Sequence, residues 1–299
     1  MYDFFSLTKR NILVFIRDKT ALFFSFLSVI ILLALYFLFL GKLYTAGLPD
    51  LTDNLKTYLS TSQMMGGILV INTLSLSLGM MGNIVVDLET HRLDAFLVTP
   101  IKRPKIILSY YLSSIIVTAI LTLLIWFATI LYVGLTSGYW YSLLVIVSTT
   151  GLLVVYTFIS ASLMILITSF LKSNNAFGTV AGVLGTFVGF VAGIYMPLAN
   201  FGKGMQYFSS ILPFTHMTIL LKQILLKEPF QLLEIELGKN IPAEDVTKIM
   251  EDIRTAYGTI EIGIFETSVS IVYILIAAGL LSLILLWLAF KNMVKKMKS

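Results

Sequence analysis

The chain has 299 residues, of which 58% are hydrophobic and 12% charged, and its mean hydropathy is +0.92. Soluble globular chains carry about 25% charged residues, so this composition excludes a soluble domain. The net charge of +5 is better explained by lysines and arginines at the cytoplasmic ends of membrane spans than by a nucleic-acid partner. The chain has no cysteine, which excludes disulfides, thiolate metal sites and a cysteine nucleophile.

Residues 1–20 are expected to form an amphipathic helix at the membrane surface. Apolar residues alternate there with Lys9, Arg10, Arg17 and Lys19, which would face anionic lipid. A plain cytoplasmic segment leading into the first span explains the pattern equally well. The first apolar run is long enough to remain as a span, so no cleaved signal peptide is expected.

Six long runs without ionisable residues predict six membrane-spanning helices, because a span needs roughly 20 mostly apolar residues. The runs are Leu22–Leu40, Thr57–Val86, Ile106–Tyr139, Trp140–Leu171, Ser173–Phe201 and Thr267–Phe290. The third and fourth adjoin across 134–138, which predicts a tight hairpin. The expected fold is an all-α membrane protein, with residues 1–299 as a single transmembrane domain.

The distribution of lysine and arginine predicts that both termini are cytoplasmic. In that orientation 13 of these residues lie inside and 8 outside, while 5 acidic residues lie inside and 11 outside. The loop 87–105 is then cytoplasmic, and residues 202–266 form an external segment.

The external segment 202–266 is expected to have two parts. Met205 to Lys227 is apolar and predicts a re-entrant or interfacial helix pair. Further on, Pro242 and Gly258 bracket an expected helix, and the segment around it forms a small external cap. One face of this helix is apolar: Val246, Ile249, Met250, Ile253 and Tyr257.

The loop 87–105 is the most strongly charged segment between two apolar runs. Pro100 disfavours helical geometry at Thr99, and Pro104 is suited to begin a helix. The pattern predicts a short charged helix, a turn, and the start of the next span. Such a helix suits docking to a soluble partner, but an ordinary loop whose basic residues fix topology gives the same pattern.

Catalytic and metal-binding patterns are absent from the sequence. The two histidines, His91 and His216, are expected on opposite sides of the membrane, and neither an HExxH motif nor an ATP-binding P-loop occurs. The six runs contain no ionisable residue, which argues against a proton-driven carrier. Energy is therefore expected from outside this chain, and the cargo is expected to be apolar or amphipathic.

Two groups of small or polar residues within the runs have alternative explanations. One helix face of the fifth run carries a glycine stripe, which either meets a second subunit, forms a mobile gate, or packs on a neighbouring span. The stripe consists of Gly178, Gly182, Gly185, Gly189 and Gly193. In the second run, polar residues either line a translocation path or make interhelical hydrogen bonds. They are Asn72, Thr73, Ser75, Ser77 and Asn83.

Several segments together resemble the membrane subunit of type-2 ABC exporters. Lys9 through Lys19 is similar to the family's amphipathic helix, and 87–100 resembles its first cytoplasmic loop. Within that loop Glu89, Leu93, Thr99 and Pro100 fall at matching positions. The segments 193–198 and 212–222 resemble the pattern after its fifth span. The sequence departs from the family at 90–92, where members commonly have a Gly-Thr-Leu type turn.

This resemblance implies two six-span permeases, identical or homologous, with two separate cytoplasmic ATPase subunits that bind ATP and Mg²⁺. The chain itself would then hold no cofactor and catalyse no reaction. It would sit in the plasma membrane and export an amphipathic compound such as a drug, an antimicrobial peptide or a lipid-like molecule. The alternative is a stand-alone scaffold, sensor or secondary carrier.

The resemblance also assigns coupling to the ATPase to the region 87–100. The residues concerned are Asp87, Glu89, His91, Arg92, Leu93, Asp94, Thr99 and Pro100. Breaking the short helix, for example with Leu93→Pro, is expected to uncouple ATP hydrolysis from export.

Overall fold

The computed structural model describes residues 2–41, 51–239, 241–260 and 271–296, which are helical or lie in turns and short links, with no strand in these ranges. The α-helices are α1 (Tyr2–Arg17), α2 (Lys19–Leu35), α4 (Asp53–Glu89), α5 (Asp94–Leu97), α6 (Arg103–Ser137), α7 (Leu143–Phe170), α8 (Asn174–Val191), α9 (Lys203–Ser210), α10 (Pro213–Leu237), α11 (Ala243–Ala256) and α12 (Ile271–Lys296). The helix α2 continues into a π-helical turn, η1 (Tyr36–Leu40), and Leu198–Asn200 forms the 3₁₀ helix η2.

Five of the described helices are long and apolar enough to cross a membrane: α4, α6, α7, α8 and α12. The helix α2 has 17 residues and continues directly into η1, so it matches the first predicted run. The pair α9–α10 is bent by 91° and forms a broken span or a re-entrant loop. The prediction of an all-α membrane protein is confirmed.

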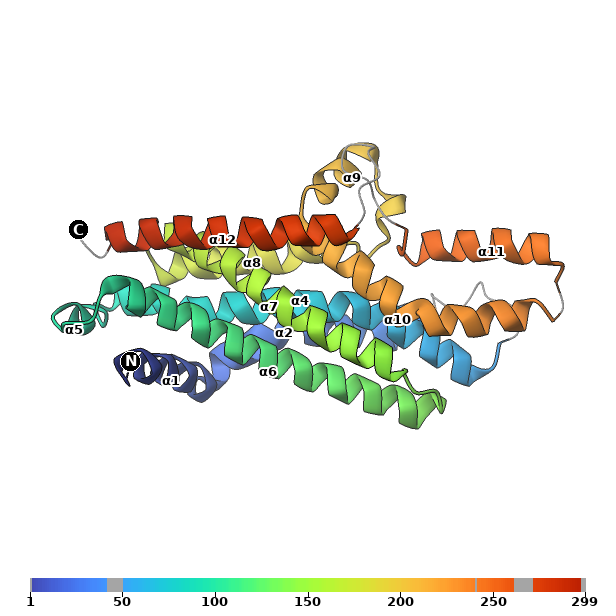
Figure 1. Ribbon diagram of the computed structural model, residues 1–299, viewed down its shortest axis with the longest axis horizontal. Helices are drawn as coiled ribbons and strands as arrows, with labels where there is room; N and C mark the ends of the chain where they lie inside the picture. The colour runs from blue at the N-terminus through green and yellow to red at the C-terminus, as the bar shows by residue number, and fades with distance from the viewer. Residues whose placement is uncertain (1, 42–50, 240, 261–270, 297–299) are drawn as a thin grey trace.

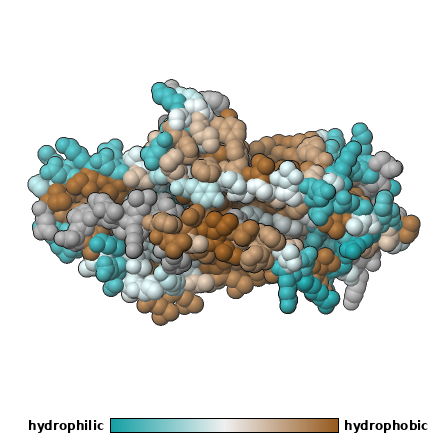
Figure 2. Space-filling model, turned by 180° about the vertical axis from the view of Figure 1, so that it is seen from behind, coloured by the Kyte–Doolittle hydropathy of each residue, from teal (hydrophilic) through white to brown (hydrophobic). Residues whose placement is uncertain are grey.

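Two clusters of elements lie at opposite ends of the elongated molecule (Figure 1). The start of α1, the short helix α5 and the end of α12 share one end, called here the α5 end, and α11 lies at the other, the α11 end. Hydrophobic residues gather over the middle of the surface in Figure 2, and hydrophilic residues lie toward both ends. This distribution is typical of a chain whose middle is in contact with lipid.

The helix α4 is the centre of the bundle, since it packs against α2, α6, α7, α8 and α10. Its glycines permit this close packing. A Cβ atom added at Gly67 would lie 2.7 Å from Ile194 Cγ2, and one at Gly82 would lie 2.8 Å from the ring of Phe177. Glycine therefore allows the segment after α8, and α8 itself, to approach the backbone of α4.

Two predicted turns are confirmed. Gly138 ends α6 in the left-handed conformation, with φ +73°, and Ser142 caps the start of α7, so the two spans form a tight hairpin. Pro242 precedes α11 and Gly258 follows it with φ +65°, as the sequence predicted. The apolar face of α11 packs in one cluster with Phe230 and Leu233 of α10.

The fifth predicted span, 173–201, is not one helix. The helix α8 ends at Val191, and Gly193 has φ +67°, a left-handed conformation that a continuing helix does not adopt. The chain then turns through Pro197 into η2. Residues 261–270, which include the predicted start of the sixth span, lie outside the described residues.

Candidate functional site

Asp87 anchors the loop between α4 and α6 at the α5 end. Its side chain is 2% exposed and accepts hydrogen bonds from both terminal nitrogens of Arg10 in α1, one of them with an Nη2–Oδ1 distance of 3.1 Å. The Tyr110 hydroxyl in α6 donates to Oδ2 of the same carboxylate. Charge-assisted, bidentate hydrogen bonds are among the strongest in proteins, so they fix α1, α4 and α6 to one another.

Further contacts extend this anchor. The Asn11 side-chain amide donates to Ser109 Oγ at 3.2 Å, and the Arg10 guanidinium lies 5.5 Å from the ring centroid of Phe96 in α5. The hydrogen bonds to Asp87 raise the pKa of Arg10 above its usual value, so the guanidinium stays charged. The four elements α1, α4, α5 and α6 therefore meet at one side chain, Arg10.

The predicted short helix is present but spans only four residues, Asp94–Leu97. The helix α4 continues through Glu89, and His91 then takes φ +56° and reverses the chain. Pro104 lies in the first turn of α6, as predicted. The left-handed residue falls in the segment 90–92, where the sequence departs from the resembled family's glycine-containing turn.

The coupling residues expected from the sequence divide into buried and exposed groups. Asp87 and Leu93 are 2% and 1% exposed, so their side chains pack inside the chain rather than at its surface. Thr99 is half-buried and donates to the Phe96 carbonyl at 2.6 Å. The remaining residues are at the surface: Glu89, His91, Arg92, Asp94 and Pro100. Of these, Glu89 accepts a hydrogen bond from the Asn174 backbone N–H at the start of α8, at 2.9 Å.

Val98 belongs to this surface, and the sequence analysis did not select it. Its side chain is 87% exposed at the end of the short helix. A single exposed apolar side chain is ordinary on a protein surface, so Val98 is of interest because of its place in the anchored loop. The signal in the sequence was an apolar residue two positions before Pro100, between the acidic and basic parts of the loop.

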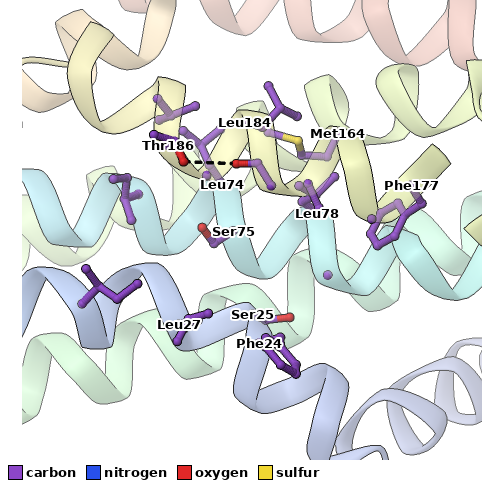
Figure 3. A pocket seen from close by; sticks show the side chains of 18 of the residues that line it. Phe24, Ser25, Leu27, Leu74, Ser75, Leu78, Met164, Phe177, Leu184 and Thr186 are labelled. Carbon is purple, nitrogen blue, oxygen red and sulfur yellow. Dashed lines mark hydrogen bonds between the residues drawn. The ribbon is translucent and has the colours of Figure 1, made fainter. Parts of the chain in front are cut away.

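A pocket of about 480 Å³ lies between α2, α4 and α8 (Figure 3). Its walls are mostly aliphatic and aromatic, with hydroxyl groups from Ser25, Ser75 and Thr186, and its lining contains no charged residue. Phe24 of α2 and Phe177 of α8 are among the residues that line it. Such a lining suits an apolar or amphipathic molecule without a buried charge.

The five glycines of the stripe do not share the same surroundings. Gly178, Gly182 and Gly185 line the pocket, and a Cβ atom added at any of them would meet nothing within 4 Å. These three glycines therefore do not serve close packing against the described part of the chain. By contrast, Gly189 packs against the ring of Tyr195, and Gly193 lies beyond the helix against Leu198.

The polar residues of α4 are mainly in interhelical hydrogen bonds. Asn72 Nδ2 donates to Thr122 Oγ1 at 2.8 Å, and the Thr73 and Ser160 hydroxyls are 2.9 Å apart. Both α4 residues are fully buried, so neither lines an open path here. Ser75 lines the pocket. Asn83 is half-buried, and its Nδ2 has no hydrogen-bond partner within the described residues.

Potential metal ligands do not gather in the part of the chain that the structure describes, where no group of three His, Asp or Glu side chains is suited to a metal ion. His216 is buried, with Nε2 at 2.8 Å from the Ser210 carbonyl, whereas His91 is exposed.

The candidate spans, the anchored loop at the α5 end and the uncharged pocket between α2, α4 and α8 define a multi-pass membrane protein. The sequence matches the family model of the ABC-2 type transporter over residues 2–226. The chain belongs to this family and is a permease component of an ABC transporter. A comparison with curated proteins found no match.

Proposed function

We propose that the chain forms the membrane path of an ATP-driven exporter and that its ATPase partner docks on the exposed residues of the α5 end. The observation that carries this proposal is the attachment of the loop by Arg10, Asp87 and Tyr110. A displacement of α5 would act on α1, α4 and α6 together, because Phe96 of α5 packs on the Arg10 guanidinium, which is held by charge-assisted hydrogen bonds.

ATP and Mg²⁺ would bind to the partner subunits, since this chain has no P-loop pattern, and the chain itself would catalyse no step. Two ATPases and a second permease, identical or homologous, would complete the transporter. The α5 end would face the cytoplasm, with both termini on that side of the plasma membrane. ATP binding can shift the membrane state only through contacts that differ between the two states, and the loop is the proposed place of those contacts.

The face formed by α2 and α8 is the proposed meeting point with the second permease. Only 17% of the apolar window of α8 is buried, the lowest share among the five candidate spans, so lipid or another chain must cover this helix. The pocket would then lie on the path between the subunits. Its uncharged lining favours amphipathic cargo, whose polar part would find the hydroxyls of Ser25, Ser75 and Thr186.

The test substitutes exposed residues, because Leu93→Pro would also disturb the packing of the Leu93 side chain, which is 1% exposed. The chain would be purified in nanodiscs with its ATPase, and vanadate-sensitive ATP hydrolysis measured. Val98→Asp is expected to lower both ATPase retention and hydrolysis by roughly tenfold, the effect of losing one contact residue worth about 1.4 kcal/mol. The matched control is Ile235→Asp at the α11 end, where the side chain is 64% exposed.

A complex that survives Val98→Asp with full hydrolysis would contradict docking at this surface. Equal losses in Val98→Asp and Ile235→Asp would do so as well, because they would point to general damage. A chain that purifies without any ATPase would favour the stand-alone scaffold or carrier.

A further inference from the structure

A second charged cluster at the α5 end lies outside the loop, where α12 ends. Lys291 and Lys295 line a hollow of about 360 Å³ together with three apolar residues of the same helix. Those residues are Trp287, Phe290 and Val294. The hollow lies on one face of α12, because residues three and four positions apart are neighbours on a helix surface.

The hollow has an apolar part and a cationic part. Trp287 is 54% exposed, and Lys291 Nζ lies 3.7 Å from its ring centroid. The segment from Ile271 to Phe290 contains no charged residue, so Lys291 marks the point where α12 passes from an apolar to a polar surrounding. Tryptophan and lysine at this level of a span are typical of the region of lipid head groups.

Contacts with α7 hold the end of α12 in a fixed orientation. Asn292 Nδ2 donates to Ser169 Oγ at 3.4 Å, and Lys296 Nζ donates to the Leu171 carbonyl at 2.7 Å. Met293 is buried on the same side. Lys296 is therefore directed into the protein, while Lys291 and Lys295 remain exposed on the other side.

Neither exposed lysine is neutralised by a carboxylate of the described residues. The ion pairs found there involve Arg10, His91 and Lys239. Lys172, which follows α7, adds a further positive charge near Lys296. The concentration of positive charge beside an apolar wall calls for an anionic ligand with a hydrocarbon part.

We propose that this hollow binds one anionic phospholipid from the leaflet at the α5 end. The phosphate contacts Lys291 and Lys295, and an acyl chain lies along Trp287 and Phe290. A small soluble anion would leave the apolar wall uncovered, and a zwitterionic lipid would bring its own positive charge to the lysines. The inference does not depend on the proposed ATPase coupling, because it needs only a membrane.

Native mass spectrometry of the full-length chain tests this site, with phosphatidylglycerol and phosphatidylcholine of equal chain length added in turn. The wild type is expected to retain phosphatidylglycerol in preference to phosphatidylcholine. Lys291→Gln/Lys295→Gln is expected to lose this preference by roughly tenfold or more, since both positive charges that would attract the anionic head group are removed. Lys239→Gln/Lys248→Gln at the α11 end removes the same charge and is expected to leave the preference intact.

Two further experiments distinguish a lipid-binding site from a surface that is merely positively charged. Trp287→Ala keeps both lysines but removes the wall, and it is expected to weaken phosphatidylglycerol retention several-fold. Inorganic phosphate at millimolar concentration is expected not to displace the lipid. Equal retention of both lipids by the wild type, equal loss in the α11-end control, no effect of Trp287→Ala, or displacement by phosphate would each overturn the proposal.

Discussion

At the scale of single residues, Asp87 determines how firmly the loop at the α5 end is attached. Arg10→Met leaves this buried carboxylate with Tyr110 but without its positive partner, and breaking a buried ion pair on one side costs about 3 kcal/mol. We expect a lower apparent Tm of the purified chain in mild detergent.

The double variant Arg10→Met/Asp87→Leu provides the control for this effect. Since it removes both charges, its loss of stability should be smaller than the sum of the single losses. An Arg10→Met chain as stable as the wild type would contradict the assignment of a buried ion pair.

His91 is held in a conformation that suits glycine, with φ +56°. His91→Gly removes the steric cost of the left-handed region, about 1 kcal/mol, and is expected to leave the apparent Tm unchanged or raise it slightly. His91→Val introduces a β-branched side chain, which is strongly disfavoured there, and should lower the Tm. A stabilising effect of His91→Val would show that the turn has a different geometry in solution.

At the scale of elements, α8 lines the pocket and packs little against the other described helices. Gly182→Leu would place an apolar side chain in the pocket, and its Cβ atom would meet nothing within 4 Å. We expect transport of an amphipathic fluorescent probe into inside-out vesicles to fall by roughly tenfold, while insertion is unaffected.

The matched control is Gly151→Leu on α7, where an added Cβ also meets nothing within 4 Å and which is not part of the pocket lining. This variant should transport at the wild-type rate. If Gly182→Leu and Gly151→Leu transported the probe equally fast, the pocket would not be part of the translocation path.

Lys222 joins three elements at the side of the bundle toward α11. Its side chain is 2% exposed, and Nζ donates to the carbonyls of Gly193 at 3.0 Å and Tyr257 at 3.3 Å. Lys222→Met leaves these buried carbonyls without that donor. We expect faster amide hydrogen exchange in α11 and after α8, with unchanged exchange in α5. Unchanged exchange in α11 would show that its apolar face alone holds it in place.

At the scale of the whole molecule, hydropathy predicted the helices because a span must be apolar over its whole length. Local rules also predicted the turns at Gly138 and Gly258. The end of α8 at Val191 was missed, since residues 192–201 are as apolar as the helix before them. The helix ends because the chain turns at Gly193, and a turn made of uncharged residues leaves no signal in the hydropathy.

The packing of α10 and the attachment of the loop depend on contacts far apart in sequence. The sequence predicted a re-entrant or interfacial helix pair within 202–266 but not its contacts, in which α10 packs against α4 and Glu228 accepts a hydrogen bond from the Tyr58 hydroxyl. Arg10 and Asp87 are separated by 77 positions, so no local pattern pairs them. Asp87 therefore looked like a surface residue in a charged loop.

In the proposed mechanism, the loop at the α5 end transmits the state of the ATPase to the pocket between α2, α4 and α8. The chain has no cysteine, so a single Gly182→Cys substitution reports on the pocket alone through its rate of modification by a maleimide. In the assembled complex, ATP with vanadate should change this rate several-fold, and Gly151→Cys should not respond. The response should disappear when Val98→Asp is added. If nucleotide left the modification rate of Gly182→Cys unchanged, or if the response persisted with Val98→Asp, the loop would not transmit the state of the ATPase to the pocket.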